Sequence, residues 1–182
     1  LMRPREAMKK KSLKLVYMAL LTAISLTIFM LEAQIPIPVP IPGVKLGLAN
    51  IVTVYAMFSF GWGPTLMILL VRIVLGGIFS GRMLSVLYSL GGGLCCYFVL
   101  LGLRKLFTQK QIWISSVIGA VFHNLGQILV AVAVTGTPAV AAYLPFLVVS
   151  GIFTGWVTGQ CAQWLSGRIG WERLNQYFSG PK

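Results

Sequence analysis

Long apolar stretches make up most of the chain, and short breaks rich in glycine, proline or basic residues separate them. A membrane-spanning helix needs about 20 mostly apolar residues. Stretches of this kind lie at 13–31, 47–60, 63–80, 83–103, 112–135 and 139–165, and the second is the shortest. The breaks are Gly61-Trp-Gly-Pro64, Ser80-Gly-Arg82, the basic segment 104–110 and Thr135-Gly-Thr-Pro138. The pattern predicts an all-α integral membrane protein, a bundle of about six transmembrane helices.

One break differs from the others because proline occupies every second position. The segment Ile35-Pro-Ile-Pro-Val-Pro-Ile-Pro-Gly43 follows the first apolar stretch. Each proline removes a backbone donor and restricts the residue before it to extended geometry. We therefore expect a stiff, non-helical loop between the first two helices.

The composition indicates that the solvent of this protein is lipid. Of the 182 residues, 57% are hydrophobic and 10% are charged, whereas soluble domains carry about 25% charged residues. A single core of this size cannot hide so many apolar side chains from water. The length favours one transmembrane domain over 13–165, with basic cytoplasmic segments at 1–12 and 166–182.

The positive charges indicate how the helices are oriented in the membrane. Cytoplasmic loops carry the excess of Lys and Arg. With six helices, one side holds Arg3, Arg5, Lys9, Lys10, Lys11, Lys14, Arg104, Lys105, Lys110, Arg168, Arg173 and Lys182. The opposite side holds only Lys45 and Arg82. We predict that both termini are cytoplasmic and that the proline-rich loop faces outward. Because the basic residues lie at helix ends, the net charge of +12 indicates contact with lipid headgroups and not with nucleic acid.

Polar side chains at membrane depth are costly and are therefore candidates for function. The candidates for substrate binding are Glu32, Lys45, Asn50, Arg72, His123, Asn124 and Gln127. The helical rise places Arg72 roughly 14 Å from the inner surface, and His123 and Gln127 roughly 17 and 22 Å from it. The set thus predicts a pocket between the mid-plane and the outer face. Its cationic members favour a ligand with an anionic group, which the amide side chains would orient.

Each candidate also has a structural interpretation. Arg72 would pair with Glu32 and hold the bundle together. His123 and Asn124 would hydrogen-bond neighbouring helices. Lys45 would extend along the apolar surface to the headgroups.

Small residues at a spacing of four indicate close contacts between helices. Ala19 and Ala23 share one face of the first helix, and Gly151, Gly155 and Gly159 form a longer stripe on the last. For the glycine stripe the favoured interpretation is packing within the bundle.

The sequence contains no pattern typical of a catalytic site. It has three glutamates, one histidine and no aspartate, and no nucleophile elbow, phosphate loop or ATPase motif. The cysteines Cys95, Cys96 and Cys161 lack the spacing of metal ligands. We expect no enzymatic activity, no metal and no cofactor.

Several of these residues lie in segments that resemble a known family. Ile41-Pro-Gly-Val-Lys-Leu-Gly-Leu-Ala-Asn50, together with Arg72, Ser80-Gly81 and His123-Asn-Leu-Gly-Gln127, resembles the Gx transporter family, whose members are often labelled heptaprenyl diphosphate synthase component I. These proteins are similar to the substrate-binding S components of energy-coupling factor (ECF) transporters. The resemblance covers about 13–165.

The resemblance implies a mechanism of import. An S component captures a small molecule from outside, here vitamin- or isoprenoid-related, and docks on a transmembrane scaffold that carries two ATPases. Docking uses an Ala-xxx-Ala surface on the first helix, which Ala19 and Ala23 match, and the loop Gln34–Lys45 would gate the pocket.

Two alternatives remain open for a protein of this family. One is a non-catalytic membrane subunit for prenyl diphosphate or quinone synthesis, and the other is a subunit for flavin-based extracellular electron transfer. Prenyl elongation itself requires clustered aspartates that hold magnesium, and this sequence has no aspartate.

Overall fold

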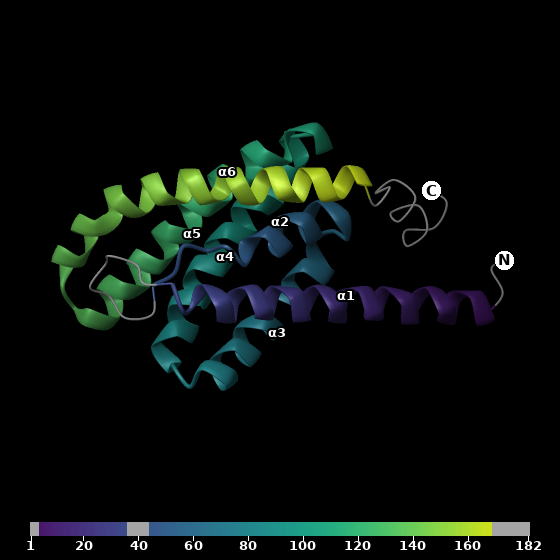
Figure 1. The fold of residues 1–182 in the computed structure, drawn as a ribbon, viewed down its shortest axis with the longest axis horizontal. Coiled ribbons are helices and arrows are strands. Elements are labelled where there is room, and N and C mark those ends of the chain that lie inside the picture. The colour runs from purple at the N-terminus through teal and green to yellow at the C-terminus, as the bar shows by residue number, and fades with distance from the viewer. Residues whose placement is uncertain (1–3, 36–43, 169–182) are drawn as a thin grey trace.

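The computed structural model describes residues 4–35 and 44–168, and these residues form a bundle of helices (Figure 1). The α-helices are α1 (Pro4–Glu32), α2 (Asn50–Ser59), α3 (Trp62–Ser80), α4 (Met83–Leu106), α5 (Ile112–Thr135) and α6 (Leu144–Arg168). Two short 3₁₀ helices, η1 (Gln109–Gln111) and η2 (Pro138–Tyr143), precede α5 and α6. The described part of the chain contains no strand, so the predicted all-α membrane bundle is confirmed.

Five of the helices have the length and composition to cross a membrane, and α2 is shorter. Its 10 residues extend over about 15 Å, half of the apolar thickness of a bilayer. The sequence predicted a start at residue 47, but Gly47 has φ +85°, which a right-handed helix does not allow. The last α-helix likewise begins later than predicted, because η2 occupies the residues that follow Thr137.

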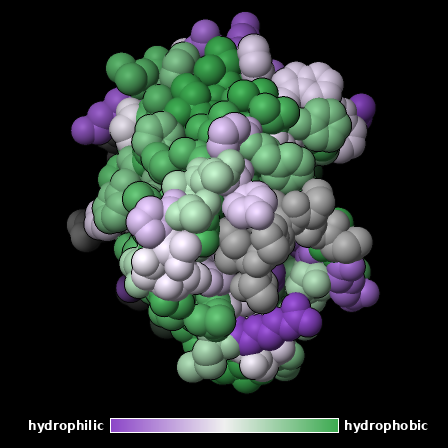
Figure 2. All heavy atoms as spheres, turned by 90° about the vertical axis from the view of Figure 1, so that its left-hand side faces the viewer, coloured by the Kyte–Doolittle hydropathy of each residue, from purple (hydrophilic) through white to green (hydrophobic). Residues whose placement is uncertain are grey.

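The bundle places apolar side chains outside and many polar ones inside. Ile78, Phe79 and Phe153 are each about two-thirds exposed, whereas Ser25, Thr65 and Ser115 are buried. Figure 2 views the end of the bundle and shows hydrophobic atoms over much of the surface, paler ones near the middle and strongly hydrophilic ones at several places along the edge. This distribution fits a surface that contacts lipid, since a soluble protein would expose its polar side chains.

Glycines allow α5 to pack closely against α6. A Cβ atom at Gly155 would lie 2.7 Å from Val117 Cα, and one at Gly159 would lie 2.6 Å from Trp113 Cα. Gly151 faces Asn124 in the same way. The glycine stripe therefore packs within the bundle, as the sequence indicated.

The two ends of the bundle are formed by different segments of the chain. The first turns of α1 and the last turns of α6 lie at one end, and residues 44–49, the α3–α4 turn and η2 lie at the other (Figure 1). Arg104 lies at the first end, where its guanidinium group approaches Gly61 between α2 and α3. This arrangement agrees with the predicted separation of basic residues. Arg3, Arg173, Lys182 and residues 36–43 of the predicted gate lie outside the described residues.

Candidate functional site

The side chain of Gln127 holds the segment that leads into α2. Its Oε1 accepts a hydrogen bond from the backbone N–H of Lys45, and its Nε2 donates to the backbone carbonyl of Lys45, each at 2.8 Å. Nε2 also donates to Asn124 Oδ1, and Asn124 Nδ2 donates to the carbonyl of Leu147 on α6. Asn124 and Gln127 thus fix residues 44–47 against α5 and α6.

Gly47 joins three helices at the same end of the bundle. Its backbone N–H donates to the carboxylate of Glu32, the last residue of α1. A Cβ atom at Gly47 would lie 2.9 Å from both Asn50 Nδ2 and His123 Cδ2. With a positive φ and no space for a side chain, this position requires glycine. Glu32, Asn50 and His123 are thereby brought around one residue.

Two cations share the aromatic ring of Phe29. Lys45 Nζ lies 3.0 Å from the ring centroid, and Arg72 Cζ lies 5.9 Å from it. Both are within the range of a cation–π interaction. Gly76 leaves room for this ring, since a Cβ atom there would lie 2.6 Å from Phe29 Cε1. Phe29 therefore occupies the space where α1 and α3 meet beside the two cations.

Several buried polar atoms around Phe29 and Gly47 have no hydrogen-bond partner among the described residues. They are Lys45 Nζ, Arg72 Nε and Nη2, both polar atoms of the Asn50 amide, and His123 Nδ1. The exposed fractions are 8% for Lys45, 2% for Arg72, 3% for Asn50 and 4% for His123. Burying such groups without partners costs several kcal/mol, roughly 1–3 for each. Most buried polar groups in native proteins are paired with protein atoms or ordered water, so these atoms mark positions where a water, an ion or a ligand would bind.

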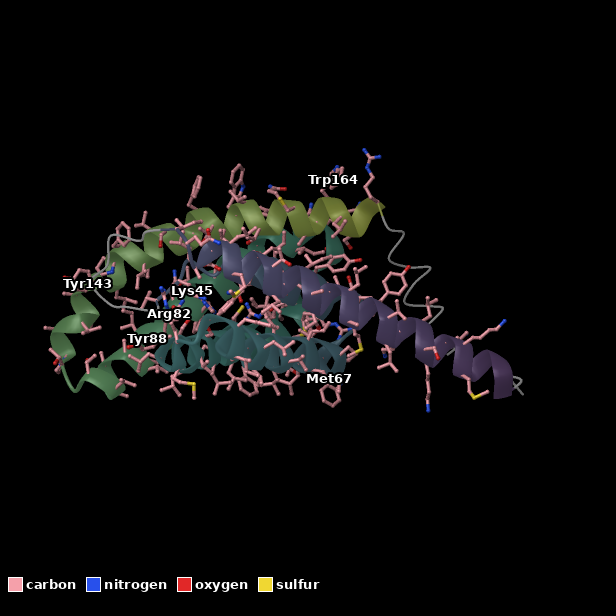
Figure 3. The ribbon with its side chains drawn as sticks, turned by 60° about the horizontal axis from the view of Figure 1, so that its bottom comes forward. Lys45, Met67, Arg82, Tyr88, Tyr143 and Trp164 are labelled. Carbon is pink, nitrogen blue, oxygen red and sulfur yellow. The ribbon has the colours of Figure 1, made fainter. Side chains whose placement is uncertain are left out.

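Burial lowers the proton affinity of the Lys45 side chain. Burial is the main cause that lowers the pKa of Lys45 to about 8 from its ordinary 10.5, and the positive charges of Arg72 and Arg82 add to this effect. The carboxylate of Glu32 acts in the opposite direction. Figure 3 shows Lys45 and Arg82 close together at this end of the bundle. At neutral pH the Lys45 ammonium is therefore charged, but it loses its proton more readily than an exposed lysine does.

The structure separates the predicted site residues into two groups. Glu32, Lys45, Asn50, Arg72 and His123 converge around Gly47 and Phe29. The hydrogen bonds of the Asn124 and Gln127 amides go to protein groups, so their direct contact with a ligand stays a prediction.

The geometry limits two of the structural interpretations. The Nε and Nη2 atoms of Arg72 make no hydrogen bond to Glu32, whose carboxylate accepts from Gly47, although the charge of Glu32 still attracts Arg72. Lys45 is 8% exposed and lies over the ring of Phe29, so it points into the bundle and not toward the headgroups.

Sequence reasoning did not count Phe29, Gly47 and Gly92 among the site residues. Phe29 lies three residues before Glu32, so helical spacing places both on one face of α1. Gly92 matters because a Cβ atom there would lie 2.7 Å from the His123 carbonyl oxygen and 2.8 Å from its Cε1. Gly92 lies in the run Gly91-Gly-Gly93, and this run alone does not indicate which helix Gly92 contacts.

A second feature lies on the membrane-facing side of α1. Ala19 and Ala23 are exposed and line a largely apolar groove of about 400 Å³ between α1 and α3. The groove is completed by Leu15, Met18, Thr22, Leu26, Met67, Ile68, Val71 and Leu75. The two alanines thus form an open surface on α1 and are not covered by other helices.

Fold and site together define a multi-pass, all-α membrane protein with a buried cationic cluster at one end. Over residues 21–165 the sequence matches the family described as heptaprenyl diphosphate synthase component I. The chain belongs to this family. Comparison with curated proteins and with solved structures gave no match.

Proposed function

We propose that this protein binds a small anionic molecule from the outer side of the membrane, as the substrate-binding S component of an ECF-type importer. The observation that carries the proposal is the pair of buried cations, Lys45 and Arg72, because Lys45 Nζ and Arg72 Nε and Nη2 lack hydrogen-bond partners among the described residues. Glu32 supplies one negative charge that acts on both cations. An anion bound between Lys45 and Arg72 would balance the second positive charge and accept hydrogen bonds from the unpaired N–H groups, which are costly when buried.

The position of the cluster supports capture from outside. It lies at the end of the bundle opposite to Arg104 and the first turns of α1. If the basic end is cytoplasmic, as the distribution of charges indicates, the cluster is near the outer surface. The Ala19–Ala23 groove supports docking on a transmembrane scaffold, because small residues let another helix approach closely.

Binding of anions by the tagged, full-length protein tests the proposal. Thermal unfolding in detergent would be followed by tryptophan fluorescence, with inorganic phosphate and benzoate as probes. We expect both anions to raise the Tm of the unmodified protein and to have no effect on Arg72→Met. Arg82→Met is the matched control, since Arg82 carries the same charge at the same end but is exposed. Equal responses of Arg72→Met and the unmodified protein would contradict the proposal.

A second candidate function follows from the description of the family. A membrane subunit of heptaprenyl diphosphate synthesis would also need a cationic site, here for a diphosphate group. We propose that such a role is non-catalytic, because the chain has no aspartate to hold magnesium.

Gentle purification of the tagged protein from its own membrane separates the two candidates. Two ATPases and a transmembrane scaffold should co-purify with an importer subunit. A prenyl synthase in their place would favour the second candidate, and flavoproteins would indicate a role in electron transfer.

A further inference from the structure

The arrangement of the unpaired polar atoms indicates the shape of the ligand as well as its charge. Nε and Nη2 of Arg72 have no hydrogen-bond partner within residues 4–35 and 44–168. These two atoms form one edge of the guanidinium group, with two parallel N–H bonds. Such an edge fits two oxygens of one carboxylate or phosphate group. The oxyanion at this site is therefore expected to bind Arg72 side-on, through two of its oxygens.

Asn50 requires a different kind of partner. Its Nδ2 donor and its Oδ1 acceptor both lack hydrogen-bond partners in the part of the chain that the structure describes, although the residue is 3% exposed. A simple oxyanion offers acceptors only, so it would satisfy Nδ2 and leave Oδ1 unpaired. Two parallel hydrogen bonds to an amide need a group that carries a donor and an acceptor side by side, such as another amide or a ureide.

Asn50 and the cations belong to one site. Gly47 contacts Asn50 and His123 and donates its N–H to Glu32, which lies one helical turn from Phe29 on α1. Phe29 in turn contacts Lys45 and lies beside Arg72. The Cδ2–Nε2 edge of His123 faces Gly47, and Nδ1, on the other edge of the ring, has no hydrogen-bond partner among the described residues.

We propose, on the basis of the proposed function, that the ligand combines two groups: an oxyanion held by Lys45 and the side-on edge of Arg72, and an uncharged amide- or ureide-like group held by Asn50. Phe29 stacks beside the oxyanion site, where its ring interacts with the two cations when no anion is bound. A prenyl diphosphate has the first group and lacks the second, because its remainder is hydrocarbon. The proposal thus excludes it as the preferred ligand.

Matched acids provide the test. The full-length protein in detergent would be titrated with orotate, which carries a carboxylate and a ureide edge, and with benzoate and uracil, which each carry one of them. Hippurate and 4-phenylbutyrate form a second pair, with and without an amide, and geranyl diphosphate represents an oxyanion on hydrocarbon. We expect an acid with the amide or ureide to bind at least about tenfold more tightly than its matched acid, the effect of one satisfied buried polar group.

Asn50→Leu should abolish this advantage. The comparison between acids on the unmodified protein stands even if this variant does not fold. Equal affinities for orotate and benzoate and for hippurate and 4-phenylbutyrate would overturn the proposal. Tighter binding of geranyl diphosphate than of orotate and hippurate would also overturn it. Either result would leave the proposed function intact as long as binding still depended on Arg72. If no probe gave a response that depended on Arg72, the proposed function itself would fail.

Discussion

At the scale of single residues, Arg72 separates a binding role from a structural one. A buried cation that stabilises the bundle should cost stability when it is removed. Arg72 is 2% exposed and its Nε and Nη2 atoms lack partners among the described residues. Replacing a buried charge of this kind by an apolar side chain of similar volume is often neutral or stabilising, by about 1–4 kcal/mol.

We therefore predict that Arg72→Met raises the Tm of the ligand-free protein while it abolishes the response to anions. Arg72→Lys should keep part of the anion response, because it retains the charge but loses the two parallel donors. Thermal unfolding with and without phosphate measures both effects. A lower Tm of Arg72→Met without ligand would show that Arg72 acts in folding.

Lys45 predicts a dependence on pH. Its folded-state pKa of about 8 lies below its ordinary value of 10.5. Anion binding needs the protonated ammonium, so affinity should be constant below pH 8 and fall above it, by up to about tenfold per pH unit. The stability of the ligand-free protein should change in the opposite direction. Between pH 8 and 10.5 the unfolded chain binds more protons than the folded one, so the contribution of Lys45 to stability increases with pH.

Lys45→Met is the control for this prediction. The positive charges of Arg72 and Arg82 and the carboxylate of Glu32 act on Lys45, and all three remain in the variant. Titrations with benzoate at several pH values should show the fall in affinity near pH 8 in the unmodified protein only. The same profile in Lys45→Met would assign the titration to another group.

At the scale of elements, the helix pair α5–α6 depends on its glycines. A Cβ atom at Gly155 would meet the backbone of α5 at Val117, which cannot move like a side chain. We predict that Gly155→Ala destabilises the protein by about 1–3 kcal/mol, as overpacking typically does. Gly102→Ala on α4 is the control, because nothing lies within 4 Å of a Cβ atom there. Unfolding of both variants in detergent checks the difference, and equal Tm values would contradict it.

The α1 helix contributes to both the apolar groove and the buried cationic cluster. Ala19 and Ala23 line the groove with α3, and Phe29 and Glu32 belong to the buried cluster further along the helix. We predict that Ala19→Trp or Ala23→Trp prevents co-purification of the scaffold and ATPases and leaves the binding of benzoate unchanged. Ile24→Trp is the matched control, since Ile24 is 44% exposed and does not line the groove. Retention of these partners by both alanine variants would remove the docking role.

At the scale of the whole molecule, the two ends should face opposite sides of the membrane. Lys45 and Arg82 lie at one end, and Arg104 and Lys105 close α4 at the other. In a chain without its native cysteines, we predict that Arg82→Cys reacts with an impermeant maleimide in intact cells. Lys105→Cys should react only after the membrane is opened. The reverse pattern would place the cationic cluster inside and exclude capture from outside.

The sequence alone predicted the bundle of helices and the separation of charge between its ends. These features follow from local composition, since bilayer thickness sets the length of an apolar stretch and every buried backbone group must be paired within its helix. It also identified the polar residues at membrane depth, because few polar residues are tolerated there.

Only the tertiary structure decided which of those residues remain unpaired. Gln127 and Lys45 are 82 positions apart, and their hydrogen bonds exist only once α5 lies beside residues 44–47. The same packing commits the amides of Asn124 and Gln127 to the protein. It leaves the Asn50 amide, Arg72 Nε and Nη2 and Lys45 Nζ without hydrogen-bond partners in the described part of the chain. Residue type determines how many hydrogen bonds a side chain can form, whereas the packing of distant segments determines which of them are formed.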